Sequence, residues 1–418
     1  MSTETLQIEK KTLVPQLRFS GFDGDWETNK LSDWKLKVID GDRGTNYPNG
    51  DDFSTEGYCL FMNAKNVTKN GFSFETKMFI TKEKDEKLRK GKLKRNDLIL
   101  TTRGSVGNIA FYDDSIKFEN LRINSGMVLI RNENSKIDSR FIYSSFFTPK
   151  LNRIIDTISF GSAQPQLTVK EINLFKFNIP TLPEQQKIAS FLSAVDEKIQ
   201  QLSRKKELLE QYKKGVMQQL FSGKLRFKDE NGKDYPDWDY KVLDDVIDFV
   251  NGKGHEQNID ENGDFVVVNS KFVSTQGRVR KFCNTQISPL TKGDMVMVMS
   301  DVPNGKALAK CYLIEKDNVY TLNQRICGLK AKKDNLNEFM IYLLNRNKYY
   351  LSFDSGVGQT NLRKDEVLNC PLFIPTSIKE QQKIANFLSS IDVKIENTGQ
   401  EIAQMQGFKK GLLQQLFV

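Results

Sequence analysis

Histidine and cysteine are scarce in this chain, and their scarcity excludes several kinds of catalytic site. Among 418 residues there is one histidine, His255, and there are five cysteines, at positions 59, 283, 311, 327 and 370. A multi-histidine metal site is therefore impossible, and a Ser-His-Asp triad has a single residue available as its base. The cysteines form no CxxC pair, which argues against a disulfide framework and against a zinc site. We expect buried thiols in a reducing compartment, the cytoplasm.

Nucleotide-binding motifs and long apolar runs are also lacking. The sequence contains no GxxxxGK[ST] motif and no GxGxxG motif between a strand and a helix. Its longest apolar run is a few residues, as at Met295–Met299, which is too short to span a membrane. Residues 1–14 are polar and charged, unlike the apolar core of a signal peptide, and are expected to form an N-terminal leader. These absences favour a chain without its own cofactor, metal or membrane partner.

The charge balance favours a polyanionic partner. Lysine and arginine number 62 against 53 aspartate and glutamate residues, a net charge of +9. With 38% hydrophobic residues, including 28 phenylalanines, the chain has enough apolar mass for real cores and is not a disordered polycation. We therefore expect folded domains with a basic surface.

The chain contains an internal duplication. Glu184–Ile199 and Glu380–Ile395 share 12 of 16 residues at a constant offset of 196. Both segments lie in long helical patterns, expected over residues 181–223 and 377–418. Thr181 with Glu184, and Ser377 with Glu380, have the spacing of a capping box, in which each glutamate closes the first helical turn.

Apolar residues follow a 3.5-residue period in both helices, which is typical of a coiled-coil seam. About 38 residues at 1.5 Å each make a rod of roughly 57 Å. A compact domain between the helices brings the end of the first near the start of the second, so we expect an antiparallel pair. The alternative is an ordinary helical hairpin within a larger core. Lys206, Lys213, Thr398 and Lys409 interrupt the seam, and the lysines either meet carboxylates of a partner or extend to water.

Two globular domains of mixed α and β structure are expected, at residues 15–180 and 224–376. Both open on the same pattern, Leu17-Arg18-Phe19 before Trp26 and Leu225-Arg226-Phe227 before Trp238. Since the second copy directly follows a helix, we expect residues 15–26 to lie beside the end of the C-terminal helix. The fold class is therefore α+β: two domains separated by an antiparallel two-helix coiled coil, with a pseudo-twofold internal repeat.

The loops of the two domains differ more than the helices do, and they concentrate basic and amide side chains. Arginine pairs with guanine edges, asparagine and glutamine pair with adenine, and lysine mostly neutralises phosphate. For any single residue, a solvated surface charge is the simpler interpretation, and the basic run Lys87–Arg95 is equally compatible with a solvated hairpin. The candidate DNA-binding residues are Arg43, Asn46, Tyr47, Lys65, Arg103, Ser105, Lys253, His255, Lys271, Arg278, Asn304 and Gln359.

The duplicated EQQKIA segments, QQLF at the end of both helices and LRF at the start of both domains together resemble the specificity subunits of type I restriction–modification systems. GDRGTNYP and TTRGSVG of the first domain also resemble the target recognition domains of that family, whereas the second domain has SDVPNG at the equivalent turn. The resemblance covers essentially the whole chain.

The resemblance implies a non-catalytic subunit that recognises a bipartite, asymmetric site on double-stranded DNA, one half with each domain. The helices would set the spacing and bind two methyltransferase subunits, which use S-adenosylmethionine to methylate adenine N6. Two restriction and motor subunits would use ATP and Mg²⁺. Two alternatives remain: a DNA-binding regulator that acts alone, and an enzyme in its own right, which would turn over with Mg²⁺ or S-adenosylmethionine.

Overall fold

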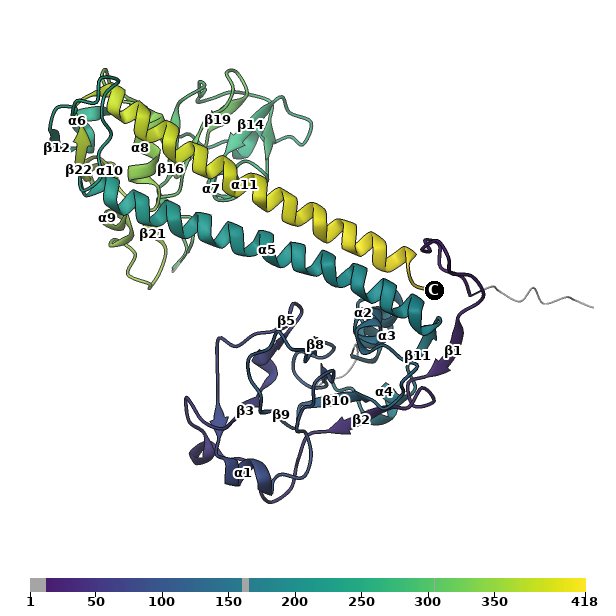
Figure 1. Ribbon diagram of the computed structural model, residues 1–418. Coiled ribbons are helices and arrows are strands. Elements are labelled where there is room, and N and C mark those ends of the chain that lie inside the picture. Colours follow the sequence, from purple (N-terminus) through teal and green to yellow (C-terminus); the bar gives the residue numbers. More distant parts are fainter. Residues whose placement is uncertain (1–12, 160–164, 304) are drawn as a thin grey trace, which may run out of the picture. The chain divides into compact units, whose positions relative to one another are not determined.

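The computed structural model describes residues 13–159, 165–303 and 305–418. Its contacts divide the chain into two units: unit 1 comprises the residues up to Ser203 together with Gln400–Val418, and unit 2 comprises Arg204–Gly399. Both units mix helices and short strands, as the sequence predicts (Figure 1). No helix in the described ranges is long and apolar enough to cross a membrane.

Unit 1 is built on a four-stranded antiparallel sheet in the order β2-β10-β7-β8, whose central strand β7 is buried along its whole length because its residues are all apolar or Thr. A smaller sheet, β6-β3-β9, contains one parallel pair. The strands are β1 (Glu27–Lys30), β2 (Leu36–Asp40), β3 (Cys59–Met62), β4 (Val67–Thr68), β5 (Gly71–Phe72), β6 (Phe79–Ile80), β7 (Leu98–Thr101), β8 (Ile109–Phe111), β9 (Leu121–Ile123), β10 (Met127–Asn132) and β11 (Lys176–Ile179). The helices are η1 (Gly50–Asp52), η2 (Ala64–Asn66), α1 (Lys82–Lys87), α2 (Ser139–Ser145), α3 (Pro149–Ser159) and α4 (Val169–Asn173).

Unit 2 repeats this plan. Its four-stranded sheet has the order β13-β20-β16-β18, and its smaller sheet, β15-β14-β19, again has one parallel pair. The strands are β12 (Trp238–Val242), β13 (Ile247–Asn251), β14 (Phe265–Val268), β15 (Phe282–Cys283), β16 (Met295–Val298), β17 (Ser300–Asp301), β18 (Cys311–Leu313), β19 (Tyr320–Leu322), β20 (Ile326–Ala331), β21 (Thr360–Asn361) and β22 (Pro371–Pro375). The helices are α6 (Leu243–Val246), η3 (Glu256–Asn258), α7 (Ser270–Ser274), α8 (Asn337–Leu344), α9 (Lys348–Leu351) and α10 (Lys364–Leu368).

The two long helices are α5 (Leu182–Phe221) and α11 (Ile378–Gln415), of 40 and 38 residues. In unit 1 the start of α5, with Leu192, shares a buried core with Leu416 at the end of α11. In unit 2 the end of α5, with Leu220, shares a core with Leu388 near the start of α11. The pairing is therefore antiparallel within each unit, as expected.

Two of the seam lysines form ion pairs between the helices. Lys409 Nζ lies 2.5 Å from Asp196 Oδ1 in unit 1, and Lys213 Nζ lies 2.5 Å from Asp392 Oδ1 in unit 2. The two lysines are 196 residues apart, and so are the two aspartates, so one pair is the repeat of the other. The expectation that these lysines meet a partner protein or extend to water is therefore wrong, because each has a carboxylate on the opposite helix.

The first-turn glutamates of both helices bind arginines. Glu184 accepts hydrogen bonds from Arg18 Nε (2.8 Å) and Nη2 (2.7 Å). Glu380 accepts from Arg226 Nε (3.1 Å) and Nη2 (2.8 Å). Both carboxylates are buried, and a buried carboxylate gains more from a bidentate guanidinium than from the helix's own amides. The hydrogen bond to Glu380 raises the pKa of Arg226. The prediction that these glutamates act in capping boxes is therefore wrong: each one binds an arginine instead.

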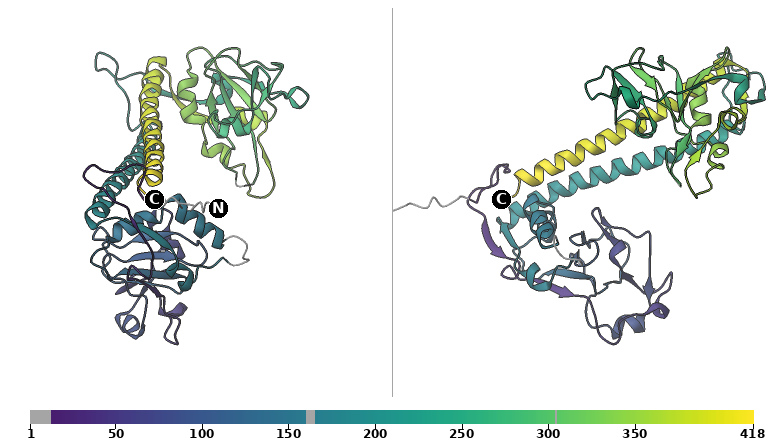
Figure 2. Two further views of the ribbon diagram at one scale, coloured as in Figure 1. Left: turned by 90° about the vertical axis from the view of Figure 1, so that its right-hand side faces the viewer. Right: turned by 180° about the vertical axis from the view of Figure 1, so that it is seen from behind.

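The repeated LRF segments occupy equivalent places. The N–H of Leu17 donates to the carbonyl of Gln415 at the end of α11 (2.9 Å), and the N–H of Leu225 donates to Gln219 at the end of α5 (3.1 Å). Figures 1 and 2 show the N-terminal segment, in purple, beside the C-terminus within unit 1. The prediction that residues 15–26 lie beside the end of the C-terminal helix is confirmed.

Candidate DNA interface

Three loops of unit 1 meet at one end of the four-stranded sheet, and they carry most of the predicted residues. Arg43 follows β2, and its Nη2 donates to the carbonyl of Ser125 (3.3 Å), which precedes β10, and pairs with the half-exposed side chain of Asp40 (3.0 Å). The N–H of Ser125 donates to the hydroxyl of Tyr47 (3.3 Å). The N–H of Arg103, which follows β7, donates to Gly126 (3.2 Å). The fold thereby gathers Arg43, Tyr47 and Arg103 from loops about 60 residues apart.

The remaining predicted residues of unit 1 lie on the same or the adjoining loops. Asn46 and Ser105 are exposed. Lys65 is exposed on η2, and Val67, the residue directly after η2, accepts at its carbonyl a hydrogen bond from Asn108 Nδ2 in the turn after β7 (3.0 Å). All six residues are thus presented by connected loops, and whether they contact DNA stays a prediction.

Asp42 holds the loop after β2 against the basic segment Lys87–Arg95. Its carboxylate accepts the backbone N–H of Gly44 (2.7 Å) and of Arg89 (2.7 Å). Burial disfavours the charged form of Asp42, but the backbone donors outweigh that penalty and lower its pKa. The charged carboxylate therefore fixes the loop without leaving a free negative charge, while the Arg89 side chain remains 77% exposed beside it.

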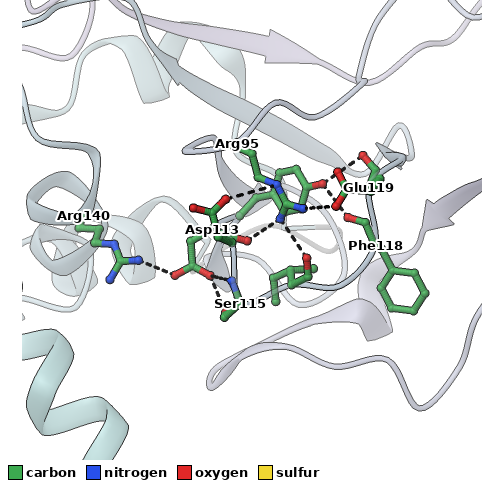
Figure 3. Close-up of polar contacts among 9 residues, drawn as sticks. Arg95, Asp113, Ser115, Phe118, Glu119 and Arg140 are labelled. Atoms are coloured by element: carbon green, nitrogen blue, oxygen red, sulfur yellow. Dashed lines mark hydrogen bonds and ion pairs between the residues drawn. The ribbon is translucent and has the colours of Figure 1, made fainter.

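Part of the positive charge of this basic segment is neutralised by ion pairs inside unit 1. Lys92 and the buried Arg122 both bind the carboxylate of Asp85, at 2.5 and 2.7 Å. Arg95 donates to the carbonyls of Asp113 (2.6 Å) and Ile116 (3.0 Å) and to the carboxylate of Glu119 (2.9 Å), as Figure 3 shows. The segment is therefore not a uniformly free cationic patch.

A groove of about 630 Å³ lies at the opposite end of the sheet, lined by Arg95, Arg131, Arg140, Leu182 and Gln186 among others. Its guanidinium groups already have carboxylate partners: Arg131 pairs with Asp97 at 2.6 Å, and Arg140 pairs with Asp113 at 2.8 Å (Figure 3). These pairs reduce the positive charge that the guanidinium groups offer to phosphate. We therefore do not assign this groove to DNA.

Unit 2 forms an equivalent cluster with different side chains. Lys253 follows β13, and its backbone binds the loop before β20 through the N–H of Gln324 (3.0 Å). The N–H of Met299, after β16, donates to the carbonyl of Arg325 (2.9 Å). Gln359 Nε2 donates to the hydroxyl of Ser300 (2.6 Å). The fold therefore brings Lys253 and Gln359, both exposed, to the same end of the sheet.

Lys271 and Arg278 of unit 2 are also exposed, on α7 and in the turn that follows it. Lys310 Nζ donates to the carbonyl of Ser274 at the end of α7 (3.2 Å). This link corresponds to that of Asn108 in unit 1, so Lys271 occupies the place of Lys65. Asn304 lies outside the described residues.

His255 does not fit its predicted role. It is 1% exposed, its Nδ1 donates to the carbonyl of Lys253 (2.8 Å) and its Nε2 lies 2.8 Å from the hydroxyl of Thr321. A carbonyl accepts only, so Nδ1 carries a proton. Because both nitrogens are occupied and buried, the prediction of direct DNA contact is corrected: His255 supports the loop that carries Lys253.

Arg325 was not among the predicted residues, although the structure places it in this cluster. It takes the position of Gly126 in unit 1, has a left-handed φ of 68° and is exposed. Aligning Asn124-Ser125-Gly126 with Asn323-Gln324-Arg325 reveals this exchange of glycine for arginine. The described residues contain no cluster of His, Cys, Asp and Glu suited to a metal ion.

Each unit thus presents a duplicated loop cluster, with unlike side chains, attached to a duplicated helix pair. The sequence profile of the type I restriction modification DNA specificity domain matches residues 24–211 and 235–406. The chain belongs to this family, and its two matched domains make it a specificity subunit of a type I restriction–modification system.

Relatives from Methanocaldococcus jannaschii cover most of the chain. The type I restriction enzyme MjaVIII specificity subunit is 26% identical over 409 residues, covering 93% of this chain and 91% of the relative. The MjaIX specificity subunit is 23% identical over 347 residues, covering 77% of each.

Solved structures show the same fold. The type I restriction-modification S subunit from M. genitalium has a TM-score of 0.62 at 15% identity, covering 97% of this chain and 99% of that one. A chain from a study of complex assembly and conformational transition of the type I R-M system has a TM-score of 0.54 at 16% identity, covering 94% and 97%.

Proposed function

We propose that each unit recognises one half of a bipartite, asymmetric site on double-stranded DNA. The observation that carries this proposal is that one loop cluster recurs at the same strand ends of both units with different exposed side chains. Unit 1 presents Arg43, Asn46 and Arg103 in this cluster, whereas unit 2 presents Lys253, Arg325 and Gln359. Different donors and acceptors on a common frame select different base sequences, while the exposed lysines neutralise phosphate.

We further propose that the helix pair binds two methyltransferase subunits, one at each repeat. Tyr212 on α5 and Phe408 on α11 are related by the offset of 196, and they are 53% and 50% exposed. Exposed aromatic residues on a helix surface are favoured anchors of protein interfaces. Their repetition supports two equivalent partner sites.

Under this proposal the chain itself is not catalytic, and the chemistry belongs to the other subunits. The methyltransferases use S-adenosylmethionine to methylate adenine, and two restriction and motor subunits use ATP and Mg²⁺. The contribution of this chain is to select the DNA site and to set the spacing between its halves.

The proposal is tested by lengthening both helices by one heptad, after Ser203 and after Gly399, where the two contact units meet along the chain. Seven residues add about 10.5 Å, so the spacer in the DNA site should grow by about three base pairs while both half-sites stay the same. Sequencing of methylated adenines in cells that carry the chain and its partner subunits measures this. Altered half-sites with an unchanged spacer would contradict the proposal.

A matched exchange tests the assignment of the units. Replacing Gly41–Arg103 with the corresponding segment of another specificity subunit should change one half-site and leave the other, and the spacer, unchanged. A stand-alone regulator is the outcome if the purified chain binds its site as tightly without the methyltransferase subunits as with them.

A further inference from the structure

Two valines of unit 2 project into solvent next to its candidate interface. Val357 is 85% exposed and Val302 is 63% exposed. Val357 is the most exposed large apolar side chain in the described part of the chain. Exposing an aliphatic side chain gains nothing for folding, and two such side chains lie close together along one short ribbon here.

Both valines adjoin the short ribbon that carries Gln359. Strand β17 pairs with β21 so that Asp301 lies opposite Thr360. Val302 directly follows Asp301, and Val357 lies three residues before Thr360. Both valines therefore lie at the same end of the two-stranded ribbon, whose strand β21 is labelled in Figure 1. Gln359, two residues after Val357, donates from Nε2 to the hydroxyl of Ser300, two residues before Val302 (2.6 Å).

The backbone beside each valine is held by an inward-facing carboxylate. Asp301 accepts the N–H groups of Val302 (2.9 Å), Ala307 (2.6 Å) and Leu308 (3.0 Å). Asp354 accepts the N–H of Gly356 (3.0 Å) and the hydroxyl of Thr360 (3.2 Å). The negative charges are thus bound to backbone and hydroxyl donors, while the apolar groups point outward.

Unit 1 differs at the equivalent turn. In unit 1 the N–H of Thr101 donates to the carbonyl of Asn108, and in unit 2 the N–H of Val298 donates to the carbonyl of Lys310. The turn that these hydrogen bonds close is therefore five residues longer in unit 2. The valine of the shorter turn, Val106, packs against the core of unit 1. An exposed valine at this turn is therefore a property of unit 2.

We propose that Val302 and Val357 contact the 5-methyl groups of thymines in the half-site that unit 2 recognises, an inference that rests on the proposed function. The thymine methyl is the one apolar group among the base edges of the major groove, and small apolar side chains are its usual contacts. Lys253, Arg325 and Gln359 beside the valines supply phosphate and base-edge contacts on the same surface. Unit 2 therefore selects its half-site partly by shape and apolar contact.

The test removes the methyl group from the DNA instead of altering the protein. The complex of the full chain with its methyltransferase subunits is titrated with duplexes of its mapped site, in which each thymine of both half-sites is replaced singly by deoxyuridine. Losing one buried methyl should weaken binding about fourfold. We expect this loss at one or more thymines in the half-site that persists when Gly41–Arg103 is exchanged.

Variants then identify the contacting residue. In Val357→Ala or Val302→Ala, the deoxyuridine penalty should disappear at the thymine that the substituted valine contacts and persist at the others. Val242→Ala, an exposed valine on β12, is the control and should keep every penalty. Melting temperatures verify that all three variants fold.

The outcomes distinguish a failure of the thymine-methyl contact from a failure of the bipartite recognition. Equal affinity for thymine and deoxyuridine throughout that half-site, or penalties that both variants retain, overturns the methyl contact and leaves the bipartite recognition intact. A methylation pattern without two separate half-sites overturns the proposed function, and the methyl contact with it.

Discussion

Replacing the buried Glu380 with glutamine should destabilise unit 2 strongly. The side chain of Glu380 is 0% exposed and accepts three hydrogen bonds, two from Arg226 and one from Trp238 Nε1 (3.1 Å). Breaking a buried ion pair typically costs about 3–5 kcal/mol. Arg226 is 24% exposed and also donates to the carbonyls of Tyr235 and Pro236. We therefore expect a loss of about 2–3 kcal/mol.

The magnitude is measured against matched variants. A unit of this size loses about 2–4 °C of melting temperature per kcal/mol, so Glu380→Gln should lower the melting temperature of unit 2 by about 5–10 °C. Glu207→Gln disrupts an exposed pair with Arg204 and should change it by about 1–2 °C or less. The double variant Arg226→Gln, Glu380→Gln should lose little more than either single variant, because both remove the same interaction.

Tryptophan fluorescence assigns the loss to one unit. The chain has three tryptophans, and Trp238 alone lies in unit 2. In a Trp26→Phe, Trp34→Phe background, urea unfolding followed by fluorescence therefore reports unit 2. If Glu380→Gln and Glu207→Gln have the same midpoint, the carboxylate does not hold the helix start against the LRF segment, and the reasoning is refuted.

Three other outcomes are expected. Trp238→Phe loses a hydrogen bond to a carboxylate and should lower the free energy of unfolding by about 1.5–3 kcal/mol. Nε1 of Trp26 has no partner among the described residues, so Trp26→Phe should lower it clearly less. Urea unfolding measures both, and equal losses would contradict this. Burial disfavours the charged form of Asp85, but the interactions with Lys92 and Arg122 outweigh burial and lower the pKa of Asp85 below the ordinary 3.8. The stabilisation of unit 1 by the charged carboxylate is therefore present above about pH 4 and is lost as the pH falls through the lowered pKa. Asp85→Asn should reduce the slope of unit 1 stability against pH in that range, and an unchanged slope would exclude Asp85 as its source. Tyr212→Ala and Phe408→Ala should each weaken methyltransferase binding about tenfold in surface plasmon resonance with unchanged half-sites, and unchanged affinity would remove these aromatics from the proposed partner site.

Periodic and repeated features were predictable from the sequence. The heptad spacing and the 196-residue offset predicted the helices α5 and α11, and the position of Leu225 after α5 predicted where Leu17 docks. These inferences succeed because helical periodicity is a local property, and because two copies of one sequence fold alike.

Partners of individual side chains were not predictable. Glu184 has the spacing of a capping box but binds Arg18, which is 166 residues away. The basic segment resembles a free cationic surface, yet Asp85 and Glu119 neutralise parts of it. His255 has the polarity of a contact residue but is buried against Thr321.

The sequence by itself therefore determined the architecture and the family: a duplicated α+β domain, two antiparallel helices, and the repeated motifs of a specificity subunit. Only the tertiary structure decided which charges remain available to a ligand. The physical reason is that a charge is neutralised by whatever the fold brings within hydrogen-bonding distance, and those groups, like Arg18 and Glu184, are distant along the chain. Tertiary packing also decided which apolar residues stay exposed, turning Val106 inward in unit 1 and Val302 outward in unit 2.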